Sequence, residues 1–211
     1  VDVDTDGNGT TDLPSATLDA VSLTIAAPAT VEVIGVAKVT LTGALALARV
    51  TAAGESTARY SVLKMGNVSV TPGTTSGTNF GLSGTLTISR LDINNAAAGH
   101  TRLNWMRAFD LDGDGTQDTL NPSGTLALDL PGSLQFALAG SISGNGSNVG
   151  DGGTLSDVLV KAGPVSVGGA AAFSLTRQSV DVDTDGNGTA DLPSATLDAV
   201  SLTIAAPATV E

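Results

Sequence analysis

The stretch VEVIGVAKVTLTGALAL (Val31–Leu47) alternates apolar residues with polar or small ones along its whole length. Apolar residues at every second position line one face of a β-strand. At ~3.3 Å per residue such a strand reaches about 55 Å, far longer than an ordinary strand of ~5–6 residues. The sequence therefore predicts either an unusually long strand or one that bends at Gly35 or Gly43.

The same alternation recurs along the chain, and turn-forming clusters separate the runs. Further runs cover residues 80–88, 134–142 and 165–175. Pro131-Gly132 and residues 144–146 are typical turn signals. Helix candidates are short, chiefly residues 95–106 and 155–161. We therefore predict an all-β fold, with long antiparallel strands in an elongated β-sandwich or barrel-like repeat.

The chain contains an internal repeat. Val1–Glu32 returns as Val180–Glu211 with a single difference, at Thr11, and the two copies are offset by 179 residues. This period is far longer than the ~20–50 residues of solenoid units. Residues 1–179 are thus predicted to be one full repeat unit and residues 180–211 the start of the next, in a fragment of a longer array.

Strand edges indicate how copies could meet. Long, weakly charged strands leave edges that pair readily with another chain. We expect the last strand of one copy to pair with the first strand of the next, so that adjacent copies of the repeat are partners. Deletion of Val180–Glu211 is then expected to lower the melting temperature sharply.

An acidic loop motif occurs three times. Asp4–Asp12, DTDGNGTTD, matches the first nine positions of an EF-hand-type calcium loop, and Asp110–Asp118 and Asp183–Asp191 share its register. Alternate side chains of such a tight loop converge on one hard cation, and the seventh residue supplies a carbonyl oxygen. The predicted ligands of calcium (Ca2+) are Asp4, Asp6, Asn8, Thr10 and Asp12; Asp110, Asp112, Asp114, Thr116 and Asp118; and Asp183, Asp185, Asn187, Thr189 and Asp191.

The loops depart from an EF-hand at the twelfth position, where a bidentate Glu would stand. Ser15, Ser194 and Asn121 occupy it here. Asp2, Asp19 and Asp181 are candidate replacements for the missing carboxylate. With fewer charged ligands, we expect an affinity in the weak extracellular class, ~10⁻⁴–10⁻³ M, and a structural role for the ion.

Composition excludes several classes of function. The chain has 21 acidic against 9 basic residues and a net charge of −12, which repels nucleic acid and anionic membranes and attracts divalent cations. No apolar run approaches the ~18 residues of a membrane-spanning helix. His100 is the only histidine and no nucleophile elbow is present, so we predict no enzyme activity. Trp105 and Tyr60 are predicted to be packing residues rather than platforms for sugars.

The near-identical long repeats, the DxDxDG loops, and a composition rich in Ala, Thr, Ser, Gly and Val with no Cys resemble the large bacterial tandem-repeat surface proteins. These are the giant calcium-dependent adhesins and their RTX-like relatives. The loops themselves are similar to those of thrombospondin repeats and dockerins. The resemblance implies an extracellular or cell-surface location, extension stiffened by calcium, and contact with neighbouring cells or surfaces.

Three functions from different classes remain open. The first is a structural repeat of an extracellular fibre or adhesin stalk that associates copy to copy. The second is a ligand-binding adhesive module. The third is a hydrophobic β assembly that carries lipid, which the long strands with one apolar face suggest.

Overall fold

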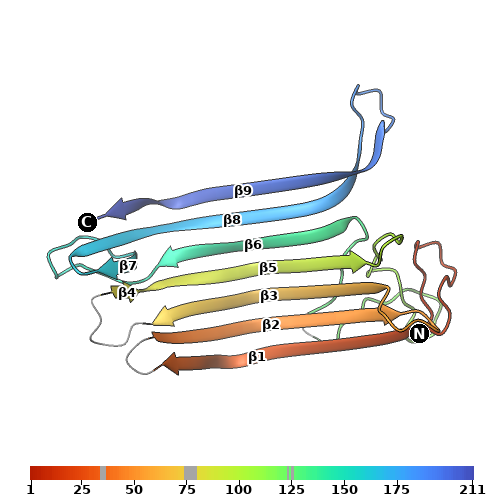
Figure 1. The fold of residues 1–211 in the computed structure, drawn as a ribbon, viewed down its shortest axis with the longest axis horizontal. Helices are drawn as coiled ribbons and strands as arrows, with labels where there is room; N and C mark the ends of the chain where they lie inside the picture. The colour runs from red at the N-terminus through yellow and green to blue at the C-terminus, as the bar shows by residue number, and fades with distance from the viewer. Residues whose placement is uncertain (34–36, 74–79, 123, 125) are drawn as a thin grey trace.

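The computed structural model describes residues 1–33, 37–73, 80–122, 124 and 126–211, and all regular secondary structure among them is β-strand. The strands are β1 (Thr17–Val33), β2 (Ala37–Thr51), β3 (Tyr60–Gly73), β4 (Phe80–Leu82), β5 (Gly84–Ala96), β6 (Leu134–Gly144), β7 (Val158–Ala162), β8 (Val165–Val182) and β9 (Leu192–Val210) (Figure 1). The predicted all-β class is confirmed. The helix candidates are wrong, because β5 runs into residues 95–106 and β7 takes most of 155–161. Over the described residues, no helix could span a membrane.

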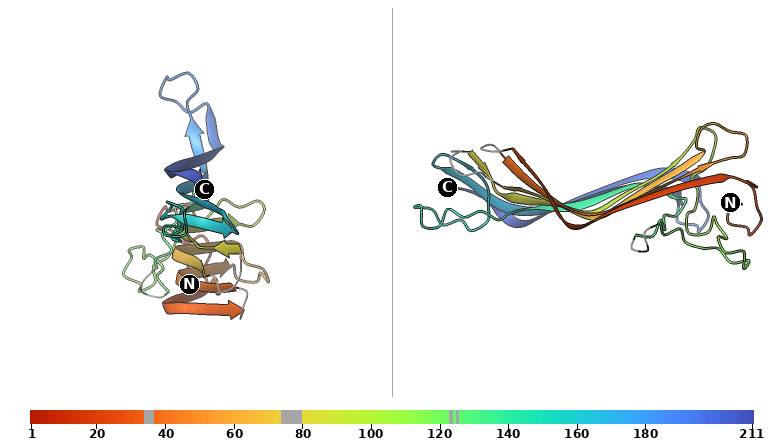
Figure 2. Two further views of the ribbon diagram at one scale, coloured as in Figure 1. Left: turned by 90° about the vertical axis from the view of Figure 1, so that its left-hand side faces the viewer. Right: turned by 90° about the horizontal axis from the view of Figure 1, so that it is seen from below.

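The long strands lie side by side in one antiparallel sheet, in the order β1-β2-β3-β5-β6-β8-β9. β7 pairs with β8 beyond the end of β6, and β4 pairs with β7. The sheet is a single twisted layer whose longest dimension follows the strands (Figure 2). It is open, with β1 and β9 at its two edges, so it is neither the sandwich nor the barrel-like arrangement that we predicted.

The predicted continuous strand Val31–Leu47 is instead a hairpin. Val33 at the end of β1 lies opposite Ala37 at the start of β2. Residues 34–36, which include the predicted bend at Gly35, lie outside the described part of the chain. Alternation alone could not reveal this turn, because both arms of a hairpin keep a period of two.

At Gly43, the other predicted bend, the structure has an irregularity in the pairing of the strands. Gly43 has φ of +135°, and the β2–β3 register shifts between Thr42 and Ala44. A Cβ atom at Gly43 would come within 2.6 Å of the Val68 side chain, so glycine is required there by both conformation and space.

The two faces of the sheet differ in chemistry. One face, here called the apolar face, carries large aliphatic residues in rows that cross the sheet. One such row is Leu23, Leu45, Met65, Leu91, Leu138, Leu175 and Val200. Leu23 and Val200, on the edge strands, are 58% and 78% exposed. No described segment covers this face at the edges of the sheet.

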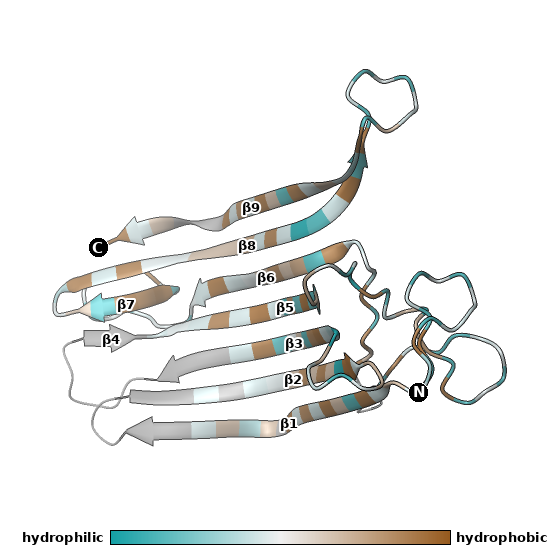
Figure 3. Cartoon of the chain, turned by 45° about the vertical axis from the view of Figure 1, so that its right-hand side comes forward, coloured by the Kyte–Doolittle hydropathy of each residue, from teal (hydrophilic) through white to brown (hydrophobic). Residues whose placement is uncertain are grey.

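The opposite face holds the core at one end of the strands. Small and medium residues of β2 and β3, such as Ala48 and Val62, are fully covered there by the connection between β5 and β6. The buried Asn94 of β5 fixes this connection. Its Nδ2 donates to the carbonyl oxygen of Leu103 at 2.9 Å, and its Oδ1 accepts from Nε1 of Trp105 at 3.1 Å. The acidic loops project from this end of the sheet (Figure 3).

Candidate metal loops and the joint between copies

The first acidic loop is organised around the carboxylate of Asp4. Its Oδ1 accepts a hydrogen bond from the backbone N–H of Gly7 and its Oδ2 from that of Gly9, both at 2.7 Å. Gly7 and Gly9 have φ of +77° and +85°, in the left-handed region that favours glycine. The glycine spacing of the motif therefore wraps the backbone around its first carboxylate.

Three carboxylates converge in this loop. One oxygen from each of Asp4, Asp6 and Asp12 lies within 4.8 Å of the other two. Asp12 Oδ2 accepts hydrogen bonds from both the hydroxyl and the backbone N–H of Thr5, at 2.6 and 2.7 Å. The hydrogen bond from the Thr5 hydroxyl has the largest effect, and together these bonds hold the pKa of Asp12 below its ordinary value. The loop thus keeps its negative charge concentrated.

The other two loops repeat this geometry. Their converging carboxylates are Asp110, Asp112 and Asp118, and Asp183, Asp185 and Asp191. As in the first loop, the leading Asp accepts from two glycine N–H groups: Gly113 and Gly115 for Asp110, and Gly186 and Gly188 for Asp183. In all three loops the first, third and ninth residues of the motif converge, and calcium ligation by them remains a prediction.

Residues at the fifth position of each loop face the backbone of the seventh. The side-chain oxygens of Asn8, Asp114 and Asn187 accept from the N–H groups of Thr10, Thr116 and Thr189 at 2.7–2.8 Å. They are not members of the converging groups of carboxylates, and the role of the threonine carbonyls as ligands remains a prediction.

The candidate replacements for the missing Glu have other contacts. Asp2 and Asp181 each accept the N–H of the serine at the twelfth position, Ser15 and Ser194, at 2.8 Å. Asp19 lies in β1, cross-strand from Arg49. Among the described residues, each acidic group therefore contains three carboxylates and does not include these three.

The first two loops are joined to each other, which the motif alone did not predict. Val3 and Phe109, each one residue before its loop, form an antiparallel bridge, and the N–H of Asp4 donates to the carbonyl of Ala108 at 3.1 Å. Both apolar residues are buried in the core. The two loops consequently lie side by side, while the third stands apart beyond the β8–β9 end (Figure 3).

The donor set fits a hard cation. Each loop presents carboxylate oxygens with no His or Cys among its converging groups, and Ca2+ takes 6–8 oxygen ligands. With an ion bound, the three carboxylates would supply part of that shell, and backbone carbonyls or water would supply the remainder. Mg2+ is less suited, because it demands strict octahedral geometry and gives up its water reluctantly.

A second candidate site is the joint where the next copy of the repeat begins. β9 belongs to that copy, and it pairs antiparallel with β8 along nearly its whole length, from Val167 opposite Val210 to Val182 opposite Leu192. Arg177 of β8 donates to both carboxylate oxygens of Asp198 in β9, at 2.6 and 2.8 Å. This bidentate pair lowers the pKa of Asp198.

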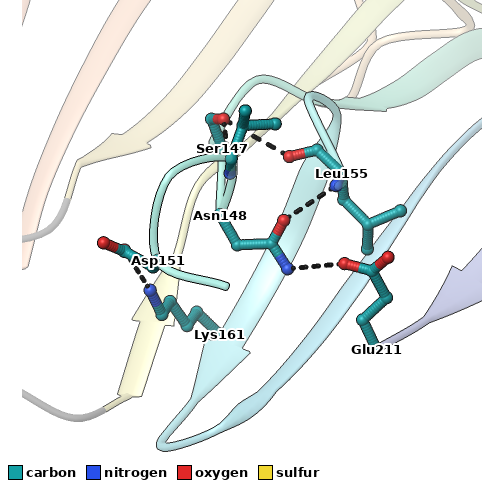
Figure 4. Close-up of polar contacts among 7 residues, drawn as sticks. Ser147, Asn148, Asp151, Leu155, Lys161 and Glu211 are labelled. Carbon is teal, nitrogen blue, oxygen red and sulfur yellow. Dashed lines mark hydrogen bonds and ion pairs between the residues drawn. The ribbon is translucent and has the colours of Figure 1, made fainter. Parts of the chain in front are cut away.

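The far end of the joint is held by Glu211. Its carboxylate accepts a hydrogen bond from Nδ2 of Asn148 at 3.1 Å (Figure 4). It also accepts hydrogen bonds from the N–H and the hydroxyl of Thr154, the former at 2.7 Å. Its backbone exchanges two hydrogen bonds with Ser166. Hydrogen bonds lower the pKa of Glu211, most strongly the one from the Thr154 hydroxyl and then the one from the Thr154 N–H. No sequence motif marked this contact; only the repeated Glu at position 32 could have pointed to it.

No protein-family model matches the chain, and no curated protein or solved structure gives a match. Trp105 and Tyr60 are buried, as expected of packing residues. The ring of Tyr60 lies edge-on to that of His100, with 6.2 Å between the ring centroids.

Proposed function

We propose that this chain is a structural repeat of an extracellular fibre or adhesin stalk, stiffened by calcium and associating copy to copy on a bacterial cell surface. In this role the repeat supplies length and rigidity rather than chemistry. The observation that carries the proposal is the joint: the start of the second copy continues the sheet of the first instead of beginning a separate body. A sheet that runs through the boundary transmits load along an array.

In this function, calcium binds the acidic loops and stiffens the end of the sheet from which they project. The three loops concentrate carboxylates at one end of the sheet, and two of them are tied to the core through Val3 and Phe109. Neutralising their mutual repulsion with a divalent ion stiffens the segment that covers the core. Millimolar calcium outside the cell suits the weak affinity expected of such loops, ~10⁻⁴–10⁻³ M.

Calcium titration tests the proposal. Isothermal titration calorimetry on the full chain is expected to show binding, and the melting temperature is expected to rise with calcium and return on chelation. Calcium at ten times the dissociation constant stabilises the fold by about 1.4 kcal/mol per site. Flat titrations together with identical melting curves in calcium and chelator would refute the calcium-stiffened fibre. Magnesium at the same concentration is the matched control.

A second candidate, a lipid-carrying β assembly, is favoured by the apolar face. Val21 and Leu23 of β1 and Val200, Leu202 and Ile204 of β9 are 58–78% exposed on it. Exposed apolar patches beyond a few hundred Å² mark interaction sites, and acyl chains are one chemistry that such a surface binds.

Lipid binding is tested by extracting the purified full chain with organic solvent and identifying co-purified lipid by mass spectrometry. Stoichiometric lipid supports the carrier, and its absence after purification from a lipid-containing lysate rejects it. Leu202→Ser, on the apolar face, is expected to lower the lipid content, whereas Ser201→Ala, on the opposite face, leaves it unchanged.

A further inference from the structure

β1 and β9 are counterparts in the repeat, and the edge that β1 leaves open corresponds to the edge through which β9 pairs with β8. Residues 17–32 have the same sequence as residues 196–211, which form most of β9. Yet β1 pairs only with β2 among the described strands, and its other edge has no strand beside it. Two strands that share this sequence therefore lie at opposite edges of one sheet. β1 pairs through one of its edges, and β9 pairs through the other.

The direction of the strands makes the two positions equivalent. Six antiparallel pairings lead across the sheet from β1 through β2, β3, β5, β6 and β8 to β9. β9 therefore runs parallel to β1. An even number of antiparallel steps returns the chain to its starting direction. The edge of β9 that faces β8 is therefore the same edge that β1 leaves open.

The two strands also present the same face. The row of paired residues that starts at Leu23 in β1 reaches β9 at Val200, whose counterpart in the first copy is Val21. The shift over one copy is thus two residues. Because side chains alternate with a period of two, an even shift leaves the apolar face on the same side of the sheet in successive copies.

We propose that the free edge of β1 binds the segment Val165–Val182 of another copy of the repeat, antiparallel and in the register that β9 has on β8. Asp19 then meets Arg177 of that copy, as Asp198 meets Arg177 here. The inference rests on the proposed copy-to-copy association and specifies its strand, register and direction. Each copy advances the sheet by six strands at ~4.8 Å, about 29 Å across the strands.

The edge of β1 is compatible with this partner. Pro28 has no N–H to give to a ladder, which normally restricts proline to edges and bulges. It falls within the register shift between Ile25 and Ala29 on the β2 side. Its counterpart Pro207 likewise falls between Ala206 and Thr209, where the β8–β9 ladder is interrupted. The irregularity therefore lies at the same point on both sides of the strand.

Charge favours the same register. Asp19 already lies cross-strand from Arg49 of β2. Arrival of Arg177 from another copy places this carboxylate between two guanidinium groups, whereas a shift by two residues sets Arg177 opposite apolar Val21. Opposite charges across a strand pair stabilise it, and a mismatch of this kind does not. At the far end of the strand, Glu32 is the counterpart in the repeat sequence of Glu211 at the joint.

A cysteine capture experiment on the full chain tests this register. Ser174 of β8 lies opposite Ser201 of β9, and Ser22 is the counterpart of Ser201 in β1. The chain has no cysteine, so any disulfide that forms must involve the introduced cysteine. The probe is a synthetic peptide of residues 165–182 carrying Ser174→Cys. Capture as a disulfide is measured by mass spectrometry with two single variants of the full chain, Ser22→Cys and Ser201→Cys, whose melting curves confirm folding.

The two variants have matched sequence surroundings and opposite expected results. The Ser22→Cys chain is expected to capture the peptide, and the Ser201→Cys chain is not, because its own β8 covers that edge. Equal capture by both chains, or by neither, overturns the inference. Arg177→Glu in the peptide is expected to lower capture up to about fivefold, and Asp19→Arg in the chain to restore it.

The outcome is separable from that of the calcium proposal. Capture is measured in calcium and in chelator. Capture at Ser22 with flat calcium titrations leaves the edge inference standing and removes the calcium-stiffened fibre. Calcium binding without capture retains the calcium loops and removes the pairing through β1.

Discussion

Val3 and Phe109 form an antiparallel bridge that holds the first two acidic loops side by side and buries both residues in the core. The third loop begins after Val182, the repeat counterpart of Val3, which pairs with Leu192 and lacks a neighbouring loop in the described chain. Two loops that differ only at Thr11 and its counterpart Ala190 thus occur once anchored and once standing alone.

This contrast predicts unequal costs for one substitution. Val3→Ala is expected to lower the free energy of unfolding by about 2 kcal/mol, because a fully buried valine loses its contacts. Val182→Ala is expected to cost well under half of that. Urea unfolding of the two variants measures the difference, and equal costs would show that the bridge does not anchor the loop.

Charge in the first loop is expected to set its calcium affinity. Asp6→Asn keeps an oxygen at the site but removes one of three converging charges, so affinity should fall on the order of tenfold. Glu55→Gln, which removes an exposed charge that pairs with Arg59 and belongs to none of the converging carboxylate groups, is the matched control and should bind calcium as before. Calorimetry on both variants makes the comparison. A loss of affinity equal in both would mean that net charge alone attracts the ion.

The pH dependence of calcium stabilisation follows from the lowered pKa values. Hydrogen bonds, chiefly from Thr5, Thr116, Gly188 and Thr184, lower the pKa of Asp12, Asp114, Asp183 and Asp191, respectively. A depressed pKa contributes stability that is present above the unfolded value, about 3.9, and is lost as the pH falls through the lower folded value.

We therefore expect the rise in melting temperature on adding calcium to persist down to about pH 4 and to disappear below it. Paired melting curves in calcium and chelator from pH 7 to pH 3 measure this. Loss of the calcium effect between pH 6 and pH 5 would contradict the expectation, because carboxylates with ordinary or lowered pKa values are still charged there.

The local features were predictable because local sequence dictates them. Alternation over residues 134–142 and 165–175 predicted most of β6 and the first part of β8, and the Asp-Gly spacing predicted tight turns in the loops that begin at Asp4, Asp110 and Asp183. Backbone conformation and short-range hydrogen bonds decide both features within about a dozen residues.

The long-range features were not predictable from one sequence. The turn between Val33 and Ala37 was hidden by continuous alternation, and the bridge from Val3 to Phe109 joins residues far apart in the chain. The expected second sheet or closure rested on the need to cover apolar residues. The fold meets that need on one face only, with the irregular segment that carries Trp105.

The repeat boundary supplies the last prediction, that deleting Val180–Glu211 lowers the melting temperature sharply. β8 and β9 are partners at fourteen positions, and at about 0.2 kcal/mol for each cross-strand pair the loss is about 3 kcal/mol. For a chain of this size that corresponds to about 6–12 °C. The deletion also bares the edge of β8, so dilute protein and light scattering are needed to separate lost stability from association.

A variant of full length controls for truncation. Thr203→Pro places a residue without an N–H opposite Ala172 in the same ladder, and it is expected to lower the melting temperature in the same direction. Thr24→Pro, at the counterpart position on the free edge strand β1, opposite Ala44, provides a comparison on a strand with one neighbour. If the deletion and Thr203→Pro both melt like the parent chain, β9 does not hold to β8 in solution and the copies are separate bodies.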